Sequence, residues 1–499
     1  MPVSVPAPAR RRSLGAMVGT AAAAASLVAA GCAAAGTAQG ATAPGVRLPT
    51  NPAWEAETTY PVVMSSPMVA TLNRVPSVVV GTYRPSTGLG GKVYAFHLAH
   101  TSTQTEWAKN TPGSVGVNST PSVNGNAIYV SVGNPSAGAR GKGGYLSLGA
   151  RGGQDWFTQV AVAPGRPDKA GVQASMAVGD LNGAKSVVAG SLGQWVDELR
   201  SANGSTRPGW PWLATDSSFD TPAIGNLFGS GKNWIVLGND QTANSVTHEK
   251  QGGHLWVLSA AGHSGSRSNE AGVHCQFTPN QGVESSPAVG RFLGGNDVGI
   301  VFGTSNAFKG ASDTDKLFAV TNQCQLRWKA SLDGLTTDSP ALVDARNNGH
   351  LQVAEGTNVS SSKGTVYLLN GATGGRYWAH DVPAPVIGGI TSANVGNGHQ
   401  DLLVPTPKGL YVLNGINGDQ LGVLGRGISL QNSALVTDDS GEIGITVAGM
   451  TVKGGNQVGE VATYRIPGTN GRRADVAGAW PMFHHDAYLT GSTLPRLNS

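Results

Sequence analysis

The stretch Gly364-Thr365-Val366-Tyr367-Leu368-Leu369 is one copy of a pattern that recurs at intervals of about 50 residues. Each copy places a glycine or a charged residue before alternating apolar and aromatic side chains. The other copies are 91–96, 144–148, 193–196, 253–258, 316–320, 409–413 and 459–464. A repeat of this length is typical of an array whose units cannot bury their apolar faces alone and must stack on one another.

Each unit also contains other short apolar runs. It begins with a small-residue turn and a first run, as in Ser285-Ser286-Pro287-Ala288-Val289, and a second run such as 299–303 follows. A fourth run ends on an aromatic residue. These aromatic residues are Trp107, Trp156, Trp210 or Trp212, Phe277, Trp328, Trp378 and Trp480, and Trp54 precedes the first unit. Short runs rich in β-branched residues and closed by glycine indicate strands rather than helices.

Four antiparallel strands in each of eight repeats predict an all-β fold, a β-propeller with eight four-stranded blades; seven blades are the alternative. A tryptophan wedged between neighbouring sheets buries roughly 150 to 250 Å². We expect residues 43–499 to form this single domain. One chain terminus should supply the strand that completes the blade of the other, because closing the ring removes exposed strand edges.

Residues 1–42 have the composition of an export leader and a small-residue linker. Arg10 to Arg12 precede an alanine-rich apolar stretch, an arrangement typical of a cleaved signal. The arginine pair leaves twin-arginine and general secretion both open. Ala29-Ala30-Gly31-Cys32 resembles a bacterial lipoprotein box that would be lipidated at Cys32, although Ala29 stands where a larger aliphatic residue is usual. We expect an exported bacterial protein, extracellular or anchored at the cell surface.

Charge and cysteine content narrow the partners. The net charge is +4, and Arg10 to Arg12 in the leader account for much of it, so nothing suggests a nucleic acid partner. A lipid at Cys32 is the one membrane attachment we expect, and the protein should be a monomer.

Cys275 and Cys324 fall near the outer ends of consecutive repeats, and an oxidising environment favours a disulfide between them. Two unpaired buried thiols are the alternative.

Several segments resemble known propeller families. Residues 178–183, 208–212 and 221–227 resemble FG-GAP or VCBS repeats of exported bacterial proteins, and Trp480-Pro481-Met482-Phe483 with Asp486 is similar to pyrroloquinoline quinone-type propeller repeats. The FG-GAP resemblance implies turns that bind calcium. The candidate ligands are Asp180, Asn182, Asp344, Asn347, Asp438 and Asp439. These turns lack most of the carboxylates that calcium needs, so we expect weak binding at most, and the same residues favour tight turns in any case.

The quinone-type resemblance implies a cofactor on the ring axis, held between a tryptophan and two adjacent cysteines beside calcium and a catalytic aspartate. This chain has no adjacent cysteines and no haem-attachment signature. We therefore expect no cofactor and assign no catalytic residue.

Acidic residues recur near the expected channel rim. Asp220 and Asp338 occupy the same repeat position, and Glu284 precedes the matching turn between them, which predicts an acidic arc on blades four to six. Solvated turn caps are the alternative, and strand alternation could turn Glu284 to the opposite face. Long polar inserts between second and third strands should gather on one face as a binding surface. These inserts are 83–91, 134–143, 239–253, 305–315 and 358–363.

Two functions follow from this pattern. The first is a cell-surface binding or scaffolding module for a protein or a cell-envelope glycan. The alternative is an enzyme that uses the axial channel, either a quinoprotein-type dehydrogenase or a carbohydrate-active propeller. Acidic and aromatic side chains gathered in the channel would favour the enzyme.

Overall fold

The computed structural model describes residues 46–98, 105–133, 143–161, 171–214, 216–242, 250–262 and 272–497. All of them belong to one compact unit, Ala38–Ser499. The expected leader, with Arg10 to Arg12 and Cys32, lies outside the described residues. Within the described part of the chain, no helix is long and apolar enough to cross a membrane.

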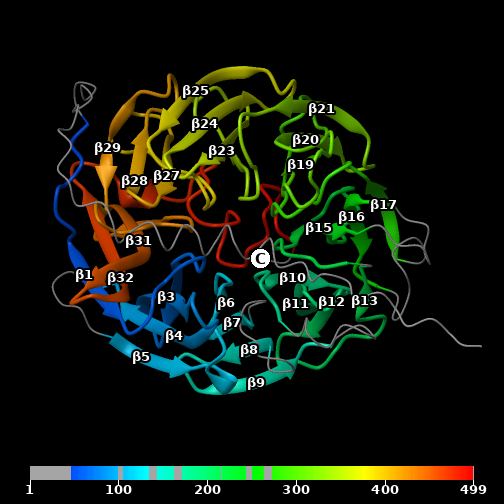
Figure 1. The fold of residues 1–499 in the computed structure, drawn as a ribbon, viewed down its shortest axis with the longest axis horizontal. Coiled ribbons are helices and arrows are strands. Elements are labelled where there is room, and N and C mark those ends of the chain that lie inside the picture. The colour runs from blue at the N-terminus through cyan, green and yellow to red at the C-terminus, as the bar shows by residue number, and fades with distance from the viewer. Residues whose placement is uncertain are drawn as a thin grey trace, which may run out of the picture. The chain divides into compact units, whose positions relative to one another are not determined.

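The described residues form eight four-stranded antiparallel sheets arranged in a ring, which confirms the eight-bladed β-propeller (Figure 1). Blade 1 contains β2 (Met68–Leu72), β3 (Val75–Arg84), β4 (Leu89–His97) and β5 (Thr105–Asn110). Blade 2 contains β6 (Ser122–Asn124), β7 (Ala127–Val132), β8 (Gly144–Leu148) and β9 (Gln154–Gln159). Blade 3 contains β10 (Ala177–Leu181), β11 (Ala184–Gly190), β12 (Trp195–Arg200) and β13 (Trp212–Leu213). Blade 4 contains β14 (Ala223–Gly225), β15 (Trp234–Gln241), β16 (Gly252–Ser259) and β17 (Val273–Phe277).

The second half of the ring repeats this order. Blade 5 contains β18 (Ala288–Gly290), β19 (Gly299–Gly303), β20 (Lys316–Thr321) and β21 (Leu326–Ser331). Blade 6 contains β22 (Ala341–Val343), β23 (Gln352–Ser360), β24 (Lys363–Asn370) and β25 (Arg376–Val382). Blade 7 contains β26 (Thr391–Ala393), β27 (Asp401–Thr406), β28 (Gly409–Leu413) and β29 (Gln420–Leu424). Blade 8 contains β30 (Leu435–Asp439), β31 (Glu442–Lys453), β32 (Asn456–Ile466) and β1 (Trp54–Thr58). Two short 3-10 turns, Pro112–Ser114 and Gly471–Arg473, complete the regular elements.

The N-terminal strand closes the ring, as the sequence predicts. Strand β1 pairs with β32 from Trp54 opposite Thr463 to Thr58 opposite Gly459, so it is the outermost strand of blade 8. The expectation that Trp480 ends a fourth strand is wrong, because Trp480 follows β32 in a C-terminal segment without strands. The fourth-strand tryptophan of this blade is Trp54.

Five other tryptophans join neighbouring blades in one repeated way. The indole N–H of each donates to a backbone carbonyl in the turn between the third and fourth strands of the next blade. The pairs are Trp107 with Ala150 (3.0 Å), Trp156 with Ser201 (2.9 Å), Trp210 with Ala260 (3.2 Å), Trp328 with Gly371 (2.7 Å) and Trp378 with Gly415 (3.2 Å). A glycine of the same turn lies flat against the ring: a Cβ on Gly152, whose φ is +69°, would lie 2.6 Å from Trp107. Thus the wedge role predicted for the tryptophans is confirmed.

The junction between blades 4 and 5 uses a disulfide in the same place. Cys275 lies opposite Val257 just before a bulge, the register that Trp107 and Trp328 hold in their own blades. Cys324, in the facing turn of blade 5, forms a disulfide with it, with 5.8 Å between the two Cα atoms. In consequence this junction is linked covalently, whereas five others are packed by a tryptophan ring.

The C-terminal segment lies inside the ring, where its red trace crosses the centre (Figure 1). Carbonyls of residues 478–491 accept backbone hydrogen bonds from the inner strand, or the residue directly after it, in seven blades. The donors are Asp344, Ser392, Val436, Val123, Val178, Ile224 and Val289. Trp480 and Leu489 are buried against these strands. The segment therefore ties the inner edges of the blades together.

Candidate functional site

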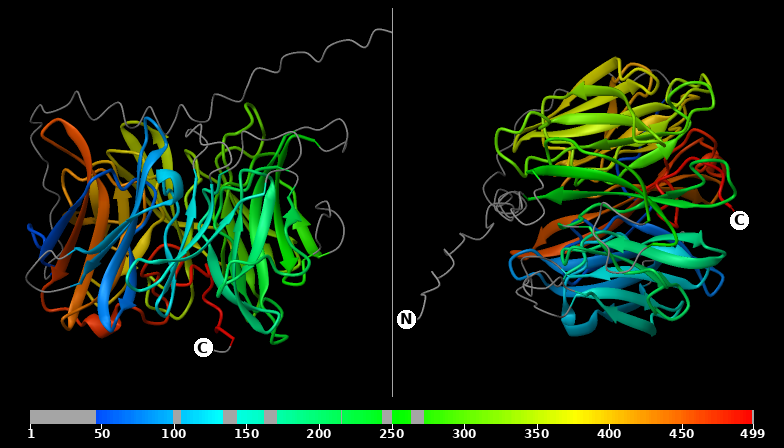
Figure 2. Two further views of the ribbon diagram at one scale, coloured as in Figure 1. Left: turned by 90° about the horizontal axis from the view of Figure 1, so that it is seen from below. Right: turned by 90° about the vertical axis from the view of Figure 1, so that its right-hand side faces the viewer.

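The two faces of the ring carry different parts of the chain. The described loops between second and third strands lie on the face where each first strand begins, because the second strand returns antiparallel to the first. We call this the insert face. Residues 134–142 and 243–249 of the predicted inserts lie outside the described residues. The C-terminus lies on the opposite side, whereas the β3–β4 and β31–β32 hairpins rise on the insert face (Figure 2). The opposite side is called the C-terminal face below.

A belt of hydroxyl groups runs from blade 1 to blade 5 at the insert face. In each of these blades, the Ser or Thr two residues before the first strand accepts a hydrogen bond from the backbone N–H of the matching residue in the preceding blade. The bonds run from Ser433 to Ser66 (3.1 Å), Ser66 to Thr120 (3.0 Å), Thr120 to Ser175 (2.8 Å), Ser175 to Thr221 (3.1 Å) and Thr221 to Ser286 (2.9 Å). The small-residue turns of the sequence repeat are therefore contacts between blades.

The residue before each belt residue anchors its own blade. Ser65 Oγ accepts from Gly81 N (2.9 Å), and Asp220 Oδ2 accepts from Gly238 N (2.7 Å). Asp220 and Asp338 hold this position and are only 1% and 7% exposed. They are therefore buried, in contrast to the solvated turn caps and the open channel rim that the sequence suggested for them. Burial raises the pKa of Asp220 well above its ordinary value.

The residues that immediately precede these anchor residues in the eight blades form a set that we call the mouth ring. Its members are Met64, Asn118, Gln173, Phe219, Glu284, Thr337, Ile387 and Gln431. All are partly exposed except Asn118 and Gln431, whereas the two residues that follow each of them are buried in every blade. Gln173 Nε2 lies 3.8 Å from the Met64 sulfur, although the two belong to blades 3 and 1. This contact and the exposure pattern indicate that the mouth ring faces the axis of the propeller.

Three acceptors of the mouth ring lack a donor. Asn118 Oδ1, Gln173 Oε1 and Glu284 Oε1 are buried atoms that receive no hydrogen bond from the described residues. Asn118 as a whole is 4% exposed. Buried polar atoms are nearly always paired in native proteins, so such a group of acceptors needs an explanation.

Two pairs of carboxyl groups lie directly behind the mouth. Glu284 lies beside Asp240 at the end of β15, and Asp338 lies beside Glu355 on β23, and the two groups of each pair interact electrostatically. A buried carboxyl next to a second one is harder to ionise. Each pair therefore favours the protonated form of at least one member.

Burial sets the titration of both pairs. It raises the pKa of Asp338 to about 7 and the pKa of Glu355 well above its ordinary range, where the charge of Asp338 adds to the effect. It likewise raises the pKa of Glu284 and that of Asp240, which the charges of Glu284, Asp216 and Asp220 raise further. Among the described residues no lysine or arginine is buried, and no ion pair neutralises these four carboxyls.

The calcium candidates lie apart, at separate turns on the C-terminal face. Asp180 pairs with Lys185 (3.0 Å), and Asp439 pairs with Arg465 (3.3 Å). Asp344 accepts from Asn348 N and Gly349 N, and Asp438 accepts from Gly441 N. Asn182 and Asn347 have φ values of +50° and +48°, as tight turns require. Within the described ranges, no three His, Cys, Asp or Glu side chains are placed to hold a metal ion.

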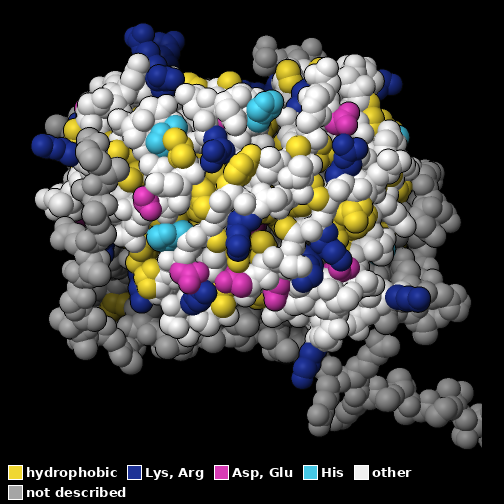
Figure 3. All heavy atoms as spheres, turned by 90° about the horizontal axis from the view of Figure 1, so that it is seen from above, with side chains coloured by type: hydrophobic (Ala, Val, Ile, Leu, Met, Phe, Trp, Pro, Cys, Tyr) yellow, Lys and Arg dark blue, Asp and Glu magenta, His cyan; other side chains and the backbone are white. Residues whose placement is uncertain are grey.

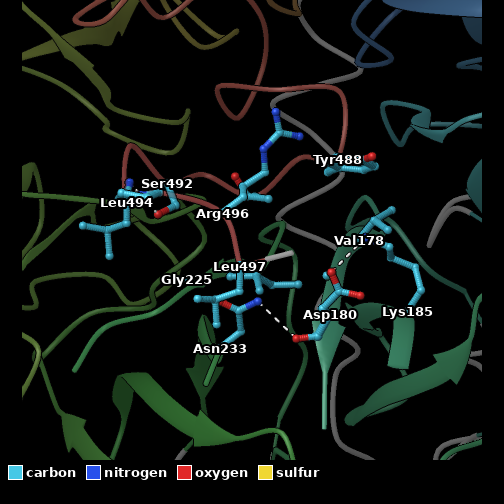
Figure 4. A pocket seen from close by; sticks show the side chains of 14 residues that line it. Val178, Asp180, Lys185, Gly225, Asn233, Tyr488, Ser492, Leu494, Arg496 and Leu497 are labelled. Atoms are coloured by element: carbon cyan, nitrogen blue, oxygen red, sulfur yellow. Dashed lines mark hydrogen bonds and ion pairs between the residues drawn. The ribbon is translucent and has the colours of Figure 1, made fainter. Parts of the chain in front are cut away.

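A cavity of about 120 Å³ lies on the C-terminal face, between blades 3 and 4 and the end of the chain (Figure 4). Tyr488 lies between two cations there, with Arg496 at 4.9 Å and Lys185 at 5.2 Å from its ring centroid. Lys185 is ion-paired with Asp180. The outer wall shown in Figure 3 interleaves acidic and basic side chains, without a large patch of one sign. Neither place combines buried unpaired acceptors with a channel opening.

His484 belongs to the closure, not to a metal site. Its ring nitrogens lie 2.7 Å from Leu489 O and 3.1 Å from Pro287 O, and the side chain is fully buried. Asp486 accepts from Thr490 Oγ1 (2.8 Å) and from two backbone N–H groups nearby. These contacts fold the C-terminal segment back on itself inside the ring.

Solved structures with a similar fold include several quinoprotein dehydrogenases. A europium-containing methanol dehydrogenase superposes with a TM-score of 0.59 at 12% identity, over 84% of this chain and 93% of that one. The quinohemoprotein alcohol dehydrogenase ADHIIG from Pseudomonas putida HK5 gives 0.56 at 12% identity, over 84% and 76%. The quinohemoprotein alcohol dehydrogenase from Comamonas testosteroni gives 0.54 at 12% identity, over 84% and 77%. No protein-family model and no curated protein sequence matches the chain.

These likenesses concern the fold alone, because identity is so low. They support the quinone-type part of the resemblance, whereas the FG-GAP part stays a prediction. The residues present do not fit a quinone cofactor: Cys275 and Cys324 are joined at the outer edge of blades 4 and 5, and the mouth ring holds no tryptophan. Among the described residues, Glu284 belongs to no group of three His, Cys, Asp or Glu side chains that could hold a metal ion.

Proposed function

We propose that the chain is an exported binding module whose partner engages the mouth ring at the insert face. The observation that carries this proposal is the set of buried acceptors without donors, Asn118 Oδ1, Gln173 Oε1 and Glu284 Oε1. A partner that donates hydrogen bonds would satisfy them. The C-terminal segment fills the ring on the other side, so the insert face is the open approach.

Export is supported by composition and by the disulfide. The leader pattern of residues 1–42 favours secretion, and a disulfide such as Cys275 to Cys324 persists in oxidising compartments. The partner is then a component of the cell envelope or the medium. A lipid at Cys32 would hold the module at the membrane surface.

The experiment compares two variants in capture from envelope extracts. Asn118→Ala combined with Gln173→Ala removes two of the acceptors, and Asn126→Ala removes an exposed amide on the C-terminal face as a matched control. We expect a specific captured component to be lost with the double variant and kept with the control. Equal capture by all three proteins would contradict the proposal.

A carbohydrate-active enzyme is the second candidate, and one observation favours it. Glu284 is a partly exposed acid whose pKa burial raises, beside the more deeply buried Asp240, and such a pair can divide proton donor and acceptor roles. Hydrolysis of cell-wall glycans that stops with Glu284→Gln would establish it. Glycan turnover that is unaffected by this change would dismiss it.

A further inference from the structure

The mouth ring contains acidic, neutral polar and apolar side chains but no basic one. Glu284 is its one charged member, and Asn118, Gln173, Thr337 and Gln431 add oxygen acceptors, while no member is basic. Behind the ring lie Asp240, Asp220, Asp338 and Glu355. Elsewhere on the insert face, Lys363 and Lys453 are occupied by ion pairs with acidic side chains. The mouth ring therefore presents negative charge and acceptors, and none of its eight residues is a cation.

We propose that the mouth ring recognises a polypeptide segment that carries a lysine, with the ammonium group at Glu284 and peptide N–H groups at Asn118 and Gln173. This inference rests on the proposed function and names the ligand class. An ammonium group has three donors and no acceptor, so it complements acceptors that lack a donor. Hydrogen bonds between ionised partners are about twice as strong as neutral ones.

The apolar members of the ring favour a polypeptide over a glycan. Met64, Phe219 and Ile387 share the ring with the acceptors, and aliphatic side chains can cover the methylenes of a lysine. A sugar ring needs aromatic faces to stack on, and Phe219 is the one aromatic member of the ring. Met64 is also flexible and polarisable, which suits an extended segment of variable sequence.

Binding should release protons. Burial raises the pKa of both Asp240 and Glu284, and the charges of Asp216 and Asp220, the other titratable groups that act on Asp240, raise that of Asp240 further. No cation faces this group among the described residues. An ammonium group placed beside Glu284 stabilises its ionised form, so affinity should rise with pH.

The test is calorimetric titration of the full protein with a peptide that carries one central lysine and has both termini blocked. The same peptide with its lysine Nε-acetylated is the probe control. We expect acetylation and Glu284→Gln each to weaken binding about tenfold, as loss of one charged hydrogen bond predicts. Asp419→Asn, on an exposed turn of the C-terminal face, should leave affinity unchanged.

A second variant covers the case in which Glu284→Gln alters the fold. Thr337→Lys places a resident ammonium in the ring and should weaken lysine-peptide binding, while the thermal midpoint reports folding. Equal binding of the acetylated and free peptides would overturn the inference. Binding of an amino-sugar oligomer in place of the peptide, dependent on Glu284, would overturn the polypeptide assignment. In either case partner capture that still depends on Asn118 and Gln173 would leave the proposed function standing.

Discussion

At the C-terminal face, residues 478–491 fill the ring and accept hydrogen bonds from seven blades, whereas at the insert face the mouth ring leaves acceptors without donors. The first region satisfies its backbone groups internally and contributes stability. The second keeps Asp240, Asp338 and Glu355 buried, and Glu284 partly buried, without a neutralising cation among the described residues. Uncompensated burial of this kind costs stability, and proteins retain it mainly where a ligand or a reaction uses it. The contrast indicates that one end of the channel closes the fold and the other serves binding.

The largest effect on stability should come from a truncation that ends the chain after Asp475. The change removes eight backbone hydrogen bonds to the inner strands and the burial of Trp480 and Leu489. At about 1 kcal/mol for each bond, plus the lost burial, the cost is on the order of 10 kcal/mol, comparable with a typical total stability. We expect loss of cooperative unfolding in calorimetry. Removing only residues 495–499 should leave the melting transition in place; equal behaviour of the two truncations would contradict the role given to the segment.

Substitutions at the outer edge of the blades should destabilise the C-terminal face and the insert face equally, because they weaken the contacts between blades. Trp328→Ala removes a buried ring and its hydrogen bond to Gly371, which predicts a loss of about 3 to 5 kcal/mol in unfolding free energy. Denaturant titration measures it, and ligand affinity of the folded variant should stay the same.

Replacing Cys275 and Cys324 together by serine should cost about 2 to 5 kcal/mol at the equivalent junction. A loss below 1 kcal/mol in both would mean that the junctions do not hold the ring together.

The acid pairs predict the pH dependence of stability. Burial raises the folded pKa of Asp338 to about 7, above its ordinary value of 3.8, so the folded state binds more protons and stability falls as pH rises through that window. His484, whose pKa burial lowers to about 4, acts in the opposite direction below about pH 6.5. Above that pH the carboxyls should dominate. We expect the thermal midpoint to fall between about pH 6.5 and 8, and Glu355→Gln to flatten this profile.

The smallest expected effect is the difference in unfolding free energy between variants of two buried amides, Asn432 and Asn118. Asn432 Nδ2 donates to Val63 O (2.9 Å) and Ala448 O (3.0 Å), so Asn432→Ala should cost about 1 to 3 kcal/mol. Asn118→Ala removes an oxygen that receives no hydrogen bond, and we expect a change within about 1 kcal/mol. Chemical denaturation of both variants decides between them. A larger loss for Asn118 would show that it supports the fold and not a ligand.

The sequence predicted the ring because its signals repeat. Glycine-led strands and the tryptophans recur in register, so the period predicted eight blades and a closure in which one terminus completes the blade of the other. Trp480 was misassigned because a tryptophan near the end of the last repeat looks like a fourth strand, while its packing inside the ring depends on contacts far along the chain. The disulfide position of Cys275 follows the same register, which the spacing alone did not reveal.

The candidate site was predicted only in part. Asp220, Glu284 and Asp338 were selected, but their partners Asp240 and Glu355 lie on second strands at unequal positions, so no repeat marks them. A signal existed, since polar residues interrupt strands that are otherwise apolar. The mouth ring went unseen because its position holds a different residue type in almost every blade, and only the exposure pattern identifies it.

The most direct test of the functional contrast is crosslinking in intact cells from one photoreactive residue at a time. The residue would replace Thr337 in the mouth ring or Arg496 on the C-terminal face, both of which are accessible. The account predicts a partner adduct from position 337 that is lost when Glu284→Gln is added, and none from position 496. An adduct from position 496 alone, or equal adducts from both positions, would contradict it.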